Sequence, residues 1–71
     1  MTTNAKAAFN ERMRTSFATL ALQLRRQSWQ HRHWAHEANA RGDSLKYHEH
    51  AARAIRDWRD AREYISLARN W

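Results

Sequence analysis

The sequence predicts an all-α fold in which two long helices pack against each other as an antiparallel hairpin. The 71-residue chain contains no proline, and its single glycine, Gly42, separates two long stretches rich in good helix formers. Apolar residues recur at spacings of three and four on both sides of this glycine, as they do on one face of an α-helix. The connection around Gly42 is short, which favours antiparallel neighbours.

The first helix is predicted over about residues 4–41, with a length of roughly 55 Å at 1.5 Å per residue. Its expected packing seam follows the three-and-four spacing and consists of Phe9, Met13, Phe17, Leu20, Leu24, Gln27, His31, Trp34 and Ala38. This helix is longer than the second, so its first ten or so residues should extend beyond the hairpin.

The predicted turn covers residues 41–44. Glycine is favoured just past a helix end, and Asp43 or Ser44 suits the N-cap of the next helix. The second helix should then cover about residues 44–69. Its expected seam consists of Tyr47, Ala51, Ile55, Trp58, Arg62, Ile65 and Ala68 or Arg69.

A hairpin of this size buries little apolar surface. A single hydrophobic core in so short a chain rarely contributes more than about 3–5 kcal/mol to the free energy of folding. The absence of cysteine excludes a stabilising disulfide. A second apolar surface is present, with Leu22 and Trp29 on the first helix and Tyr64, Leu67 and Trp71 on the second. We predict a homodimer that forms a four-helix bundle. A surface for a different partner is the alternative, and the two are compatible.

No residue pattern indicates an enzyme, a catalytic residue or a cofactor site. The single glycine excludes a glycine-rich phosphate loop, and two helices offer no cleft of useful size. The carboxylates Asp57, Asp60 and Glu63 alternate with arginines, and helix-surface ion pairs are the expected explanation for them.

The histidines leave two interpretations open. His33 and His36 are three residues apart on one helix, and His48 should come near His36 across the turn. Neutral imidazoles in this arrangement suit Zn, Ni or Cu. The alternative is a solvated basic face that gains charge below about pH 6.5. We assign no metal site, and the sequence does not decide whether these histidines ever bind metal.

The basic residues are the strongest functional signal. Eleven arginines and two lysines give a net charge of +6, and no acidic residue lies between Met13 and His36. We expect a basic surface on the side of the first helix away from the seam, formed by Arg12, Arg25, Arg26, Arg32 and His33. Beside an exposed Trp29, such a surface suits phosphate contact with base stacking, or an acidic protein surface. A face that only maintains solubility is the third interpretation.

The predicted function is that of a small non-enzymatic binding protein. Such a protein would occupy, and inhibit or modulate, a functional surface of a partner protein or complex. Small helical hairpins without motifs are typical of phage and mobile-element proteins that block one host macromolecule. The alternative is a module that binds RNA or DNA through the arginine-rich face of the first helix. The residues expected to contact the partner are Leu22, Arg25, Arg26, Trp29, Arg32, Tyr64, Leu67 and Trp71.

The expected location is the cytoplasm, without membrane contact. No stretch of the sequence approaches the roughly 18 apolar residues of a membrane span. The first residues, Met1 to Lys6, are not followed by the apolar run of a signal peptide.

Overall fold

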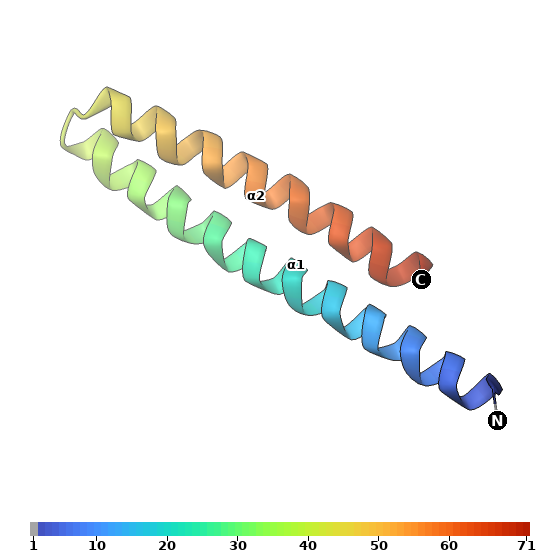
Figure 1. The fold of residues 1–71 in the computed structure, drawn as a ribbon. Helices are drawn as coiled ribbons and strands as arrows, with labels where there is room; N and C mark the ends of the chain where they lie inside the picture. The colour runs from blue at the N-terminus through green and yellow to red at the C-terminus, as the bar shows by residue number, and fades with distance from the viewer. Residues whose placement is uncertain (1) are drawn as a thin grey trace.

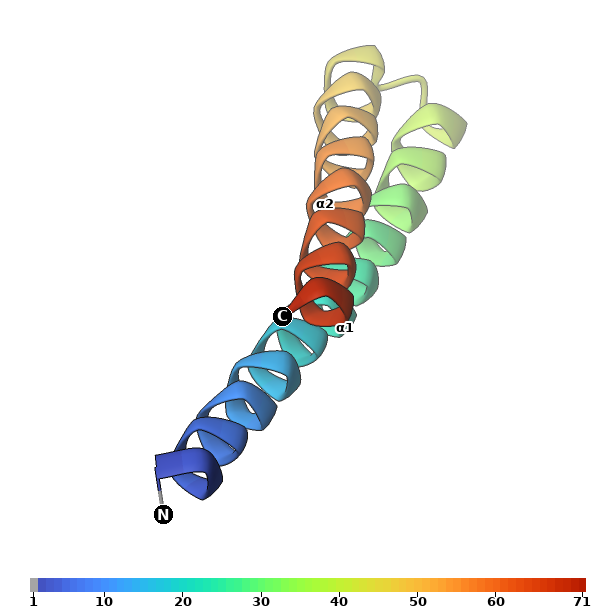
Figure 2. The ribbon, with the colours of Figure 1, turned by 90° about the vertical axis from the view of Figure 1, so that its right-hand side faces the viewer.

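The chain forms two α-helices that run antiparallel, side by side (Figure 1). The computed structural model describes residues 2–71, with side chains from residue 4, and places α1 at Thr2–Ala40 and α2 at Ser44–Asn70. The rod measures 62 × 13 × 12 Å, and α1 continues past the end of α2 (Figure 2). The predicted all-α hairpin is confirmed. The four-helix bundle involves a second copy of the chain and stays a prediction.

Across the described residues 2–71, neither helix combines the length and the apolar character that crossing a bilayer requires.

The turn around Gly42 ends one helix and starts the next. Gly42 has φ +76°, its N–H donates to the carbonyl of Asn39 at 3.1 Å, and the N–H of Asp43 donates to Ala38 at 2.9 Å. These two bonds form a Schellman motif, which satisfies carbonyl groups at the helix end. Asp43 then caps α2, because its Oδ1 accepts from the N–H of Lys46 at 3.1 Å.

Two rows of small residues set the contact between the helices. They recur every seven residues and consist of Ala21, Ser28 and Ala35 on α1, and Ala54, Ala61 and Ala68 on α2. Ala38 and Ala61 are 0% exposed. The hydroxyl of Ser28 donates to the backbone carbonyl of Ala54 at 2.7 Å. A side chain as short as serine reaches the opposite backbone only when the helices lie close together, as small residues allow.

Aromatic side chains close the open end of the hairpin. The Phe17 ring lies 6.0 Å from that of Tyr64 and 5.5 Å from that of Trp71, between ring centroids. The ring centroid of Phe9 lies 6.3 Å from that of Trp71, and the indole Nε1 of Trp71 donates to Oδ1 of Asn10 at 3.2 Å. The last residue described is thereby tied to α1.

The predicted seam is correct in period and wrong in part of its membership. Met13, Phe17, Leu24, His31 and Ala38 are buried or half-buried as expected. Ile55, however, is 62% exposed, and Trp34 and Trp58 are also exposed. The rows of small residues occupy the closest contact, so these larger side chains are displaced to its flanks.

The expected ion pairs along α2 are also wrong. The ion pairs among the described side chains join His33 to Glu37 at 3.1 Å and Lys46 to Glu49 at 3.7 Å. Asp57 is instead buried in the seam, at a position that alternates with the small residues. Its negative charge acts on His31 of α1, and it forms none of these ion pairs.

Enlarging a residue at the closest contact should force the helices apart. We expect Ala61→Leu to lower the free energy of unfolding by about 1–3 kcal/mol, measured by urea denaturation followed by circular dichroism. Ala52→Leu, on the exposed side of the same helix, is the control and should change it by less than about 0.5 kcal/mol. Equal effects of the two substitutions would contradict the alanine contact.

Replacing the turn glycine should cost stability through backbone strain alone. A Cβ at position 42 would meet no atom within 4 Å, but φ is +76°. We expect Gly42→Ala to lower the free energy of unfolding by about 1–2 kcal/mol, without loss of helix content by circular dichroism. Gly42→Asn, which tolerates this backbone region better, should recover part of the loss.

Candidate functional site

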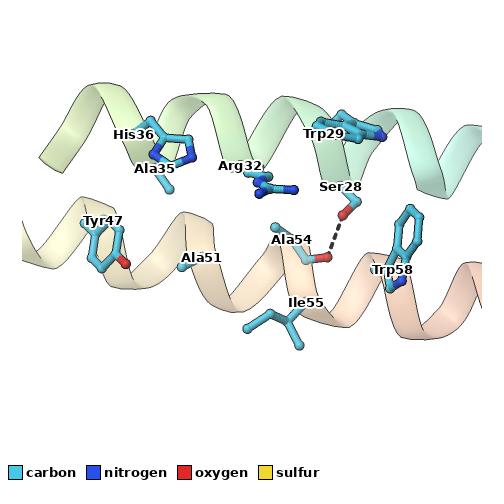
Figure 3. A pocket seen from close by; sticks show the side chains of 10 residues that line it. All are labelled: Ser28, Trp29, Arg32, Ala35, His36, Tyr47, Ala51, Ala54, Ile55 and Trp58. Carbon is cyan, nitrogen blue, oxygen red and sulfur yellow. Dashed lines mark hydrogen bonds between the residues drawn. The ribbon is translucent and has the colours of Figure 1, made fainter. Parts of the chain in front are cut away.

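Two hollows lie along one side of the hairpin. The first, of about 430 Å³, is drawn in Figure 3. It is lined by Ser28, Trp29, Arg32, Ala35 and His36 of α1 and by Tyr47, Ala51, Ala54, Ile55 and Trp58 of α2. Small residues of the seam form its floor, while Trp29, Ile55 and Trp58 stand at its sides.

The second hollow, of about 570 Å³, continues the same side toward the open end of the hairpin. It is lined by Arg14, Thr15, Ala18, Ala21, Leu22 and Arg25 of α1 and by Ile65, Ala68 and Arg69 of α2. Leu22 precedes Trp29 by seven residues and Ile65 follows Trp58 by seven, so the two hollows share one side. We call the residues that line them the arginine–tryptophan face.

Two arginines lie against the tryptophans of this face. The Arg32 guanidinium carbon lies 5.2 Å from the centroid of Trp29, and that of Arg25 lies 5.3 Å from Trp58 on the opposite helix. These are cation–π distances. A guanidinium that stacks by its plane keeps N–H donors at its edge for an anion. The face therefore combines exposed apolar area with cations held beside it.

Neither hollow of the arginine–tryptophan face is lined by an aspartate or glutamate. A third hollow, near the turn, is lined by charges of both signs, namely Glu37, Arg41, Asp43 and Lys46, together with Trp34 and His50. The two hollows of the face therefore carry arginines without the carboxylates that line the hollow near the turn. The sequence predicted a basic surface on the first helix, whereas the arginines that line these hollows come from both helices, with Arg69 on α2.

Four of the residues expected to contact a partner come together on this face: Leu22, Arg25, Trp29 and Arg32. Arg25 and Arg32 were expected on the side away from the seam, and this is wrong. The seam is formed by Ala21, Ser28 and Ala35, which places both arginines directly beside it. Arg26 is exposed, one position further out.

The other three expected residues lie elsewhere. The rings of Tyr64 and Trp71 lie against Phe17 at the open end of the hairpin, and Leu67 is exposed outside both hollows. Sequence reasoning assigned Ile55, Trp58 and Ile65 to the core and so missed them on the face. The seven-residue spacing of Ala51, Trp58 and Ile65 is the signal that identifies them as one stripe.

A histidine pair beside Trp34 joins the two helices. Nδ1 of His31 and Nδ1 of His50 are 3.0 Å apart, a hydrogen bond that needs one ring to donate and the other to accept. Burial lowers the pKa of His31, and the charges of His50, Arg53 and Arg56 lower it further, against the opposing effect of Asp57. The pair is therefore stable while at least one ring is neutral.

The histidines considered as metal ligands do not form a cluster. His33 pairs with Glu37, and the His48 ring lies 5.2 Å from Tyr47. In the part of the chain that the structure describes, no three histidine or carboxylate side chains are placed to hold a metal ion together.

No known protein family, curated protein or solved structure matches this chain. What the arginine–tryptophan face binds is therefore argued from its own residues.

Acid should weaken the fold through the histidine pair. The pKa of His31 is lowered in the folded chain, so below about pH 6.5 the unfolded chain binds a proton more readily and stability falls with pH. We expect His31→Gln to flatten the dependence of the melting temperature on pH between 7.5 and 5. His36→Gln, which removes an exposed histidine, should leave it unchanged. The same slope in all three proteins would contradict this role.

Proposed function

We propose that this chain is a non-enzymatic binding protein that docks its arginine–tryptophan face onto an acidic surface of a partner protein. By occupying that surface it would inhibit or modulate the partner. The observation that carries the proposal is the coincidence, on one side of the hairpin, of exposed tryptophans and arginines without any carboxylate.

The energetics favour this side as the contact. Trp29 is 59% exposed and Trp58 is 42% exposed, so both offer large apolar area that a partner can remove from water. Tryptophan and arginine are the residue types in which binding energy concentrates at protein interfaces. Arginines beside the apolar centre would favour an acidic partner and speed its association.

The lining of the hollows also bears on the nucleic-acid alternative. Phosphate groups need cationic partners, whereas the floor is formed by alanines and the sides carry Leu22, Ile55 and Ile65. A nucleic acid seated here would place charged backbone against apolar side chains. A protein surface with an apolar centre and acidic edges complements the face better.

A second copy of this chain fits the face poorly, because two-fold pairing would bring its arginines together without a carboxylate between them. We therefore expect the predicted homodimer to use a surface outside this face. A dimer formed in this way would leave Trp29 free for the partner.

The partner complex should depend on Trp29 and not on Trp34. Trp34, 41% exposed and outside both hollows of the face, is a matched control for the 59% exposed Trp29. We expect Trp29→Ala to weaken partner binding by about 30-fold, corresponding to the roughly 2 kcal/mol of an interface hot spot. Trp34→Ala should leave binding within about twofold. The measurement is quantitative capture from nuclease-treated lysate with each immobilised variant, followed by titration of the captured protein.

Three outcomes would contradict the proposal. A protein that is captured equally by all variants does not use this face, and one that is lost with Trp34→Ala uses the other side. Untagged protein that elutes with nucleic acid and releases it only at high salt would favour the nucleic-acid alternative. In that case Arg25→Glu combined with Arg32→Glu should lower the salt dependence of binding.

A further inference from the structure

We infer that the segment of the partner that occupies the arginine–tryptophan face is an amphipathic α-helix with acidic edges, lying along the hairpin as a third helix. This inference rests on the proposed function and names the form and the chemistry of the occupant. Its evidence is the repeat of the face, the composition of its floor, and the position of its arginines.

The side walls repeat with the period of a packed helix. Leu22 and Trp29 on α1, and Trp58 and Ile65 on α2, are each seven residues apart, which is about 10.5 Å at 1.5 Å per residue. A helix with apolar residues at positions i, i+3, i+4 and i+7 presents the same repeat. A helix of about four turns would therefore place apolar side chains in both hollows.

The floor excludes an extended occupant on energetic grounds. It is formed by helical side chains, namely the alanines and Ser28, and the Ser28 hydroxyl already donates to Ala54. Helical backbone groups bond within their own helix, so the floor has no row of free donors and acceptors that an extended segment could use. An extended segment would bury unpaired N–H and C=O groups, whereas a helix brings its own hydrogen bonds.

The arginines define the edges of the occupant. Arg32 stacks on Trp29 at the α1 side, the guanidinium of Arg25 reaches from α1 to Trp58 at the α2 side, and Arg69 belongs to α2. Glutamates or aspartates that flank the apolar stripe of the third helix would meet these guanidinium groups, whose forked donors match a carboxylate. Lysines at the same positions would meet like charge.

Three synthetic peptides without tryptophan test the inference against the wild-type protein. The first is a 21-residue helix with leucine at two positions of each heptad and glutamate at the flanking positions. The second has lysine in place of each glutamate. The third keeps the acidic composition but carries prolines at two central, outward-facing positions that prevent helix formation. Binding is followed by the fluorescence of the protein's own tryptophans.

The acidic helix should bind at least tenfold more tightly than either other peptide. Trp29→Ala and the pair Arg25→Glu with Arg32→Glu should each weaken it at least tenfold, while Trp34→Ala should not. Equal affinity for the helical and the proline-containing acidic peptides would overturn the helical occupant and leave acidic docking intact. Equal affinity for the acidic and lysine peptides would overturn the acidic edges.

Binding that is insensitive to Trp29→Ala would also overturn the inference, because the peptide would then lie elsewhere. If no peptide binds, the third helix is overturned, and the proposed function is judged separately. Capture of a partner that is lost with Trp29→Ala and kept with Trp34→Ala would show that the face docks a surface of another form.

Discussion

The close approach of two helices over rows of alanine and serine is the constraint on which the rest of this structure depends. Ala38 and Ala61 are fully buried, and the Ser28 hydroxyl reaches the backbone of the opposite helix. Space between the helices is therefore too small for tryptophan or isoleucine along most of the seam. In a chain with four tryptophans, the seam itself forces most of the large apolar area outward. The surface that a partner would contact is thus a direct consequence of how the core is packed.

The same constraint organises the charges. The two hollows of the arginine–tryptophan face are lined by arginines, tryptophans, aliphatic residues and other side chains without a carboxylate, whereas Glu37 and Asp43 line the hollow near the turn and Asp57 is buried in the seam. Each of two tryptophans then has a guanidinium beside it, which keeps the cation close to the apolar centre at little cost in side-chain freedom. Packing and electrostatics therefore indicate the same side of the molecule.

The sequence predicts the helices, the turn and the antiparallel arrangement, because Gly42 and the spacing of apolar residues specify them locally. It fails on the exact seam. Leu20, Trp34 and Ile55 have the right period and the larger apolar area, so a count of hydrophobicity prefers them to Ala35 and Ala61. The structure places alanine at the contact because the distance between the helices depends on the side chains of both. The periodicity of one helix considered alone does not reveal that distance. The same error hid Trp58 and Ile65 from the predicted contact surface, although Leu22, Trp29, Arg25 and Arg32 were identified.

Rows of similar small residues do not by themselves determine which residues of the two helices lie opposite one another. Sliding one helix by seven residues would set alanine or serine against alanine again, so the packing surfaces alone leave several alignments nearly degenerate. The polar contacts lift that degeneracy. The hydrogen bonds from the Ser28 hydroxyl to the Ala54 carbonyl and between His31 and His50 form in only one alignment. The short turn enforces the same alignment. These few hydrogen bonds thus select one alignment of the two helices, which the packing of small residues alone would not specify.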